Sequence, residues 1–139
     1  MKRRKFIALL RGREEVPSIR TFSFGRFQAK VTKNKQKLLY KIILDNISKV
    51  TAVNLYLGRR GKVGPMVAKL FGPINSSISV LRGVIEGAIT SENLTGPLKG
   101  KNIKRLIKKI EKGKIYVNVK TKTNPTGKLR GQLIQIIKY

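Results

Sequence analysis

Side chains suited to acid–base or metal chemistry are scarce in this sequence, which has six carboxylates and neither histidine nor cysteine. Catalysis therefore lacks its usual proton shuttle, and a zinc, copper or iron site is not expected without imidazole or thiolate ligands. The only adjacent acids, Glu14 and Glu15, would point to opposite faces of a strand, which makes them a poor acid–base pair. We expect no enzyme, no catalytic or metal-binding residues and no cofactor.

Basic side chains are far more numerous than acidic ones. The chain has 139 residues with 32 Lys and Arg against 6 Asp and Glu, a formal net charge of +26. Such a charge attracts polyanions and makes copies of the chain repel one another at low salt. Nucleic acid, an anionic cell-wall polymer and an acidic protein are all eligible partners, and composition does not choose among them.

Two stretches concentrate these basic residues. The segment GRRGKVGP at 58–65 is either a turn that needs glycine conformations or an anion cradle, since arginine binds phosphate and carboxylate groups bidentately. The cradle would use Arg59, Arg60 and Lys62. Between residues 99 and 114 there are eight basic residues and one acid, which is either a solvated helix face or a polyanion contact. The contact would use Lys101, Arg105, Lys108 and Lys112.

The elements that position these residues are expected to be mostly strands. Alternating apolar residues and turn signals predict strands at 5–10, 22–31, 38–44, 50–57, 66–71, 77–89, 114–121 and 128–139, with a bulge at Gly25-Arg26. Apolar residues at i, i+3, i+4 and i+7 predict one amphipathic helix over 103–112, with Asn102 as its N-cap. Regularly spaced short strands indicate an antiparallel sandwich or barrel. We expect a single all-β domain over 1–139.

The first residues, MKRRKFIALLRG, have the charge pattern of a secretory signal, but the apolar part FIALL is too short for one. We interpret it as the first strand. The sequence predicts no signal peptide and no membrane span. Synthesis in the cytoplasm is therefore expected, with later deposition on a spore or cell surface as one outcome.

Several segments, taken together, resemble the CHRD domain, a family named from chordin and widespread in bacteria. They are FIALLRGREEVP near the start, VTAVNLYLGRRGKVGPMVAKLF and GVIEGAITSENLTGPLKG in the middle, and GKIYVNVKTKTNPTGKLRGQL at the end, spanning roughly residues 5–133. The resemblance implies a Greek-key antiparallel β-sandwich of the superoxide-dismutase type.

The family pattern has histidine where this chain has Asn54, Tyr56 and Lys120. Three imidazoles could converge on a metal, whereas an amide, a phenol and an ammonium group do not replace them. Two interpretations of Asn54 and Tyr56, which share one strand face, stay open. They form either an ordinary hydrogen-bonded polar face or a recognition surface.

Two further segments are singled out near the C-terminus. The resemblance favours a structural role for Arg130, Gly131 and Gln132, and a buried Arg130 would need a partner, for which Glu15 is the candidate. The segment LIQIIKY is apolar on both faces, with Leu133 and Ile137 on one and Ile134 and Ile136 on the other. It is either core or a sheet edge that adds to a neighbouring copy.

Two functions remain open. The first is a non-enzymatic structural protein with a strongly cationic surface that assembles with copies of itself, as a component of a surface layer or spore coat. The alternative is a module that binds nucleic acid or an anionic cell-wall polymer without sequence specificity, with binding that weakens steeply with salt.

Overall fold

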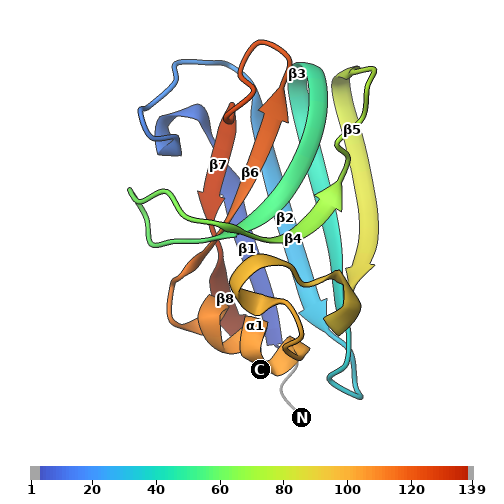
Figure 1. Cartoon of the computed structure of the whole chain (residues 1–139). Coiled ribbons are helices and arrows are strands. Elements are labelled where there is room, and N and C mark those ends of the chain that lie inside the picture. The colour runs from blue at the N-terminus through green and yellow to red at the C-terminus, as the bar shows by residue number, and fades with distance from the viewer. Residues whose placement is uncertain (1–3, 138–139) are drawn as a thin grey trace.

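Eight strands and one α-helix make up the computed structural model, which describes residues 4–137 (Figure 1). The strands are β1 (Arg4–Leu10), β2 (Phe24–Val31), β3 (Leu38–Leu57), β4 (Met66–Phe71), β5 (Ile78–Ile89), β6 (Ile115–Thr121), β7 (Leu129–Gln132) and β8 (Ile134–Ile137). The helix α1 spans Ile103–Glu111, and three short 3-10 helices are η1 (Gly12–Glu14), η2 (Ser91–Asn93) and η3 (Gly96–Leu98). All strand pairs are antiparallel, so the all-β class expected from the sequence is confirmed.

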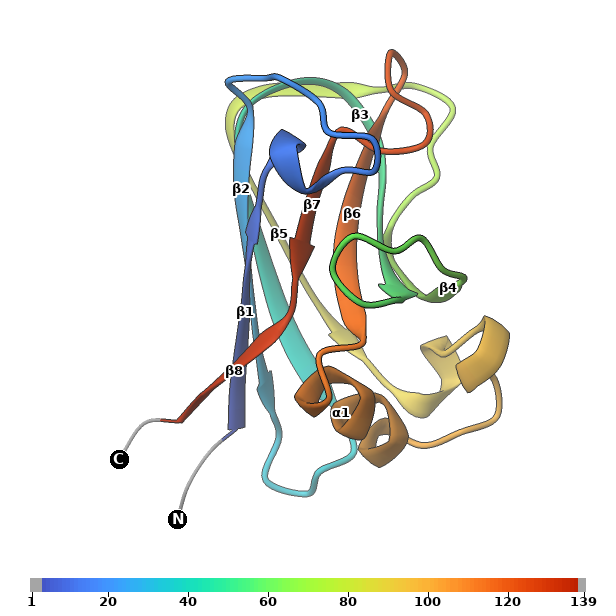
Figure 2. The same cartoon turned by 90° about the vertical axis from the view of Figure 1, so that its left-hand side faces the viewer.

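The long strand β3 belongs to both layers of the sandwich. Its first part pairs with β2 and β5, and its last part pairs with β6 and β4. One layer is therefore β8-β1-β2-β3-β5 and the other is β7-β6-β3-β4. Figure 2 shows how β3 bends from one layer into the other.

The two layers meet along one side, where β7 lies beside the end of β1. Arg11 and Arg130 exchange backbone hydrogen bonds of 3.0 Å in each direction. Gly131 is required there, because a Cβ atom on it would come within 2.2 Å of the Leu9 carbonyl oxygen. β8 then continues past this junction and pairs with β1. The sheet is therefore nearly closed into a barrel.

One apolar core fills the space between the layers. Buried side chains of β1, β2 and the first part of β3 (such as Phe6, Phe27 and Ile42) belong to the same cluster as Leu55 and Val117 from the other layer. α1 closes the lower end of the sandwich (Figure 1) with four buried residues: Ile103, Leu106, Ile107 and Ile110. These are the residues whose spacing predicts the helix, and the Asn102 side chain accepts a hydrogen bond from the Arg105 amide at 3.1 Å as the predicted N-cap.

Three details of the predicted strands are wrong. Segments 38–44 and 50–57 form one strand, because pairing on both sides carries β3 through the DNIS segment despite positive φ values at Asn46 and Lys49. Segment 128–139 divides into β7 and β8, which pair with different strands. β2 pairs in unbroken register through Gly25 and Arg26 on both sides, so no bulge is present there.

Candidate functional site

The three positions at which the family pattern has histidine lie together on the outer face of β3 and β6. Asn54 is opposite Asn118, and Tyr56 is opposite Tyr116. The buried Asn54 donates a hydrogen bond from Nδ2 to the Tyr56 hydroxyl at 3.3 Å. The Tyr56 ring stacks on the Tyr116 ring with centroids 5.3 Å apart, and the Lys120 ammonium nitrogen lies 5.4 Å from the Tyr56 ring centroid.

These residues do not fit a metal ion. Lys120 brings a positive charge to the place where a cation would have to sit, and the Tyr56 ring is occupied by stacking. Within residues 4–137 no cluster of three or more Asp, Glu, His or Cys side chains could hold a metal. The arrangement is that of a packed polar face.

Two loops cover this polar face and bury it. The Tyr116 hydroxyl accepts a hydrogen bond from the Gly64 amide at 3.2 Å, from the loop after β3. From the loop after β1, Glu15 accepts hydrogen bonds from Asn118 Nδ2 at 3.4 and 3.3 Å. Figure 2 shows both loops against β6 and β7.

Glu15 is a carboxyl group held out of water, with only 8% of its surface exposed. Burial raises its pKa to about 7, and the opposing effects of Arg130, the Asn118 hydrogen bond and Lys120 are smaller. The side-chain oxygens of Asn54 and Asn118 are buried without a hydrogen-bond partner among the described residues. Glu15 therefore stays protonated to a higher pH than an exposed glutamate does.

Arg130 does not form the predicted ion pair with Glu15. No contact within 4.0 Å joins the two groups among the salt bridges of residues 4–137. Arg130 is 2% exposed and donates a hydrogen bond to the Arg59 carbonyl at 2.9 Å, and its guanidinium lies 3.5 Å from the Tyr116 ring centroid. Burial lowers the pKa of Arg130. The Arg59 carbonyl and the Tyr116 ring thus contact the Arg130 guanidinium in place of the expected carboxylate. Glu15 affects the charge of Arg130 only through electrostatic attraction at longer range.

Gln132 ties β7 to two neighbouring turns. Its side-chain amide donates to the Gly58 carbonyl and to the Gly113 carbonyl, both at 2.8 Å. With Gly131 packed against Leu9, the Arg130-Gly131-Gln132 segment holds the loop after β3 and the end of α1 in place. The geometry agrees with a structural use of this segment.

The loop at 58–65 does not present three free cations. Arg60 pairs bidentately with Glu14, with Nε–Oε1 and NH2–Oε2 distances of 2.7 and 2.8 Å, and this contact lowers the pKa of Glu14. Arg59 instead donates from NH1 to the Lys112 carbonyl at 3.3 Å. Lys62 is exposed at the tip of the loop. Arg60 is therefore paired with Glu14 and does not contribute a free cation to the predicted anion cradle. Arg59 lies against the end of α1.

A cationic cluster, formed by Arg59, Lys109, Lys112 and Lys114, results from this arrangement. Repulsion from Lys109, then from Arg59, lowers the pKa of Lys114, with smaller effects of burial and Lys112. None of the four is in a salt bridge with another described residue. Lys109 and Lys114 were not singled out as site residues, although the density of basic residues between 99 and 114 pointed to them.

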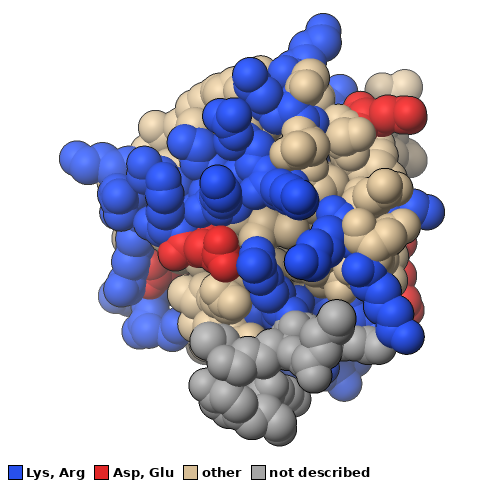
Figure 3. Space-filling model, turned by 90° about the horizontal axis from the view of Figure 1, so that it is seen from below, with Lys and Arg blue, Asp and Glu red and all other residues tan. Residues whose placement is uncertain are grey.

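The exposed side of α1 extends this cluster. Lys101, Arg105 and Lys108 are exposed, as their positions opposite the apolar stripe predict. Seen from below, Lys and Arg side chains cover much of the lower face, over which α1 lies (Figure 3). The predicted helix cations therefore share a surface with Arg59.

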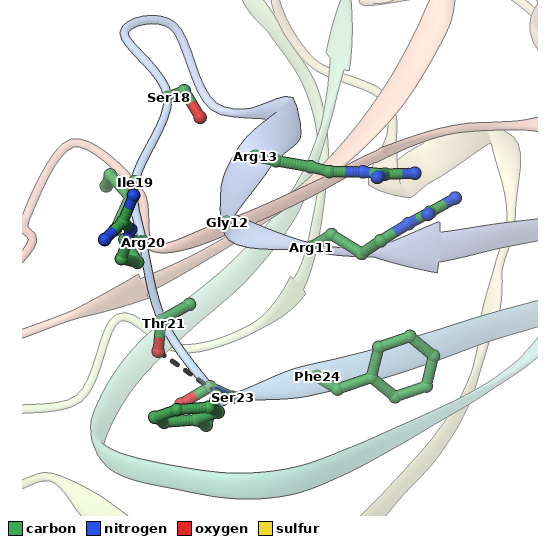
Figure 4. Close-up of a pocket in the computed structure, with 10 residues that line it drawn as sticks. Arg11, Gly12, Arg13, Ser18, Ile19, Arg20, Thr21, Ser23 and Phe24 are labelled. Carbon is green, nitrogen blue, oxygen red and sulfur yellow. Dashed lines mark hydrogen bonds between the residues drawn. The ribbon is translucent and has the colours of Figure 1, made fainter.

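A pocket between the start of η1 and the segment leading to β2 carries further arginines. It is lined by residues 11–13 and 18–24, among them Arg11, Arg13 and Arg20. Figure 4 shows Arg11 and Arg13 extending together to one side of the Gly12 turn, whereas Arg20 lies on the other side. These arginines do not converge on one point, so the pocket is not an obvious anion site.

The predicted assembly residues are divided between core and surface. Leu133 is completely buried, which excludes it as a contact between copies, because its backbone bonds to Ile115 and directs the side chain inward. Ile134 is 55% exposed and Ile136 is half-buried. The side chain of Ile137 lies outside the part of the chain that the structure describes. β8 is the last strand of its layer and pairs only with β1 in the described structure.

The comparisons with known proteins identify the family. The CHRD domain family model matches residues 6–133, nearly the whole chain, so this protein belongs to the CHRD domain family. No curated protein and no solved structure matches the sequence. None of the helices in residues 4–137 has the length and apolar character needed to cross a membrane.

Proposed function

We propose that this protein is a non-enzymatic module that binds an anionic polymer, such as nucleic acid or a cell-wall polymer, without sequence specificity. The observation that carries this proposal is the cationic cluster of Arg59, Lys109, Lys112 and Lys114. Like charges held close together raise the free energy of the folded protein, and a bound polyanion relieves that repulsion.

Salt-gradient retention on heparin and on DNA tests this proposal. The variant Lys109→Gln/Lys112→Gln removes two charges from the cluster. Its matched control, Lys5→Gln/Lys30→Gln, removes two charges from a cross-strand pair on the outer face of β1 and β2. On duplex DNA the slope of log affinity against log salt should fall by about 2 for the cluster variant, since each lost phosphate contact removes about 0.9. The control variant Lys5→Gln/Lys30→Gln should change this slope little.

Equal losses in the two variants would show that binding follows net charge and not the cluster. Absence of retention at low salt for the unmodified protein would remove the proposal altogether. Circular dichroism of both variants shows whether the fold is retained.

A second candidate function is a structural subunit that assembles with copies of itself into a surface layer or spore coat. What favours it is the exposed Ile134 on β8, a strand at the end of its sheet. Exposed apolar edge strands pair readily with other chains. The two functions are compatible, because a cationic subunit can assemble on an anionic surface or be brought together by a polyanion.

Electron microscopy and sedimentation of the full chain across salt concentrations test assembly. Deletion of residues 134–139 should reduce the size of the assemblies if β8 contributes. Monodisperse monomers at all salt and protein concentrations, or assemblies unaffected by the deletion, would count against a role of β8.

A further inference from the structure

β5 is the longest exposed edge strand of the sandwich. Its twelve residues pair with β3 on one side, and no other described strand pairs with its second side. Figure 1 shows β5 as the outermost strand at the right. Its surface includes Leu81, which is 87% exposed, and Val84, which is 52% exposed. Proteins usually protect such an edge strand from pairing with another chain, for example with a proline or a β-bulge. β5 contains no proline, and its pairing with residues 38–47 contains no bulge.

The outer face of β5 and β3 is also a place where charge is balanced. Lys41 lies opposite Glu86, and Asp45 lies opposite Arg82, with an Arg82–Asp45 ion pair of 3.1 Å. Two of the six acids of the chain are on this small patch. Because the chain carries +26 overall, a locally neutral patch is where two copies can approach with the least repulsion.

We propose that β5 is a self-association surface, and that it pairs antiparallel with β5 of a second copy of this chain about a twofold axis at Val84. In this register Val84 faces Val84 of the second copy. Arg82 then lies directly opposite Glu86 of the second copy, and the twofold axis forms this pair of opposite charges twice. Leu81 lies opposite Gly87 of the second copy, over which the Tyr40 ring packs.

Charge selects this register among the neighbouring ones. An axis at Arg82 would place two arginines opposite each other, and an axis at Glu86 would place two glutamates opposite each other, both unfavourable. An axis at residue 83 or 85 would leave both charges opposite apolar residues. Within residues 4–137 Glu86 has no ion-pair partner within 4.0 Å, so its carboxylate is available for Arg82 of the second copy.

This inference does not depend on polyanion binding, and it gives the assembly function a second contact besides β8. The twofold β5 pair would extend one layer of the sandwich into a continuous sheet across two copies. The cationic cluster lies at the end of α1, on different elements, so each dimer would carry two such clusters.

Cysteine cross-linking tests the register directly, because the chain has no cysteine of its own. Val84→Cys would place two thiols on the twofold axis, within the Cα separation that a disulfide allows. The control is Val63→Cys, which lies in the loop after β3 and is more exposed than Val84. Under mild oxidation without polyanion, Val84→Cys should form a covalent dimer at least tenfold faster than Val63→Cys. An equal or slower rate would overturn the proposal.

A charge reversal tests the paired ions. Glu86→Lys places a lysine opposite Arg82 of the second copy twice, whereas the control Glu92→Lys makes the same change of charge at an exposed acid outside β5. In the Val84→Cys background, Glu86→Lys should slow dimer formation at least tenfold, and Glu92→Lys should slow it by less than threefold. Equal slowing would show that only net charge matters and would refute the register. Heparin retention of the reduced Val84→Cys protein reports polyanion binding separately, so failure of one proposal leaves the other measurable.

Discussion

At the scale of single residues, Glu15 couples folding to pH. Its pKa rises from an ordinary 4.5 to about 7 in the folded protein, mainly through burial. The folded state therefore holds this proton more tightly than the unfolded state. The contribution of Glu15 is most favourable below about pH 4.5 and is lost as the pH rises through about 7.

The variant Glu15→Gln should remove this dependence, because glutamine carries no charge at any of these pH values, and its Oε1 still accepts one of the two hydrogen bonds that Asn118 Nδ2 donates to Glu15. Relative to the variant, the unmodified protein should lose about 3 kcal/mol of unfolding free energy between pH 4.5 and pH 8. Urea denaturation of both proteins across that range measures the difference. Glu92→Gln, at an exposed position, serves as the control.

Parallel stability curves for the unmodified protein and Glu15→Gln would show that Glu15 titrates normally. The lowered pKa of Glu14 acts in the opposite direction, since its contribution is lost as the pH falls below 4.5. The difference between the two proteins isolates Glu15 from that effect.

The sequence predicts the neighbourhood of the polar face better than its contacts. The spacing of Asn54 and Tyr56 places them on one strand face, and they do lie together, joined by a hydrogen bond. The prediction of a Glu15–Arg130 ion pair is wrong. The position of Glu15 depends on how the loop after β1 packs over β6, and no local sequence pattern encodes that packing. The bidentate Arg60–Glu14 pair was missed for the same reason.

At the scale of elements, regular segments with strong periodicity were predicted well. α1 and its N-cap follow from apolar spacing and from Asn102, and both are local signals. The DNIS segment carries a real local turn signal, with positive φ at Asn46, but pairing with β5 and β2 before it and with β6 and β4 after it keeps β3 continuous. Division of the last strand into β7 and β8 likewise depends on β1, which is distant in sequence.

The contact between β7 and β1 gives a prediction for the junction of the two layers. Gly131→Ala should destabilise the protein by about 1–3 kcal/mol, because its Cβ would lie 2.2 Å from the Leu9 carbonyl and the backbone would have to move. Gly61→Ala is the control, since nothing lies within 4 Å of its Cβ and only its φ of 82° opposes alanine. Thermal unfolding should show a larger loss for Gly131→Ala, and equal losses would show that the junction is not tightly packed.

At the scale of the whole molecule, 32 basic residues against 6 acids make self-repulsion a property of the folded state. Three of the six acids already form ion pairs among the described residues: Glu14 with Arg60, Asp45 with Arg82, and Glu111 with Arg4. Added salt screens the remaining repulsion over distances longer than about 10 Å at 0.1 M.

Raising sodium chloride from about 10 mM to about 300 mM, where the screening length becomes shorter than the molecule, should therefore raise the Tm. An increase of about 4 °C would correspond to about 1 kcal/mol for a domain of this size. Differential scanning calorimetry measures it, with sucrose as a control for effects unrelated to charge. A Tm independent of salt would mean that the cations are too far apart to destabilise the fold.

The continuity of β3 also has a consequence for how the molecule unfolds. Because one strand supplies hydrogen-bond partners to β2, β5, β4 and β6, neither layer can open without disrupting the other. The amide protons in the middle of β3 should therefore exchange with solvent deuterium only through global unfolding, whereas those on the free edge of β5 exchange through local fraying. A fragment that ends before β6 would leave the second part of β3 unpaired on one side, so the two halves of this protein are not expected to fold independently.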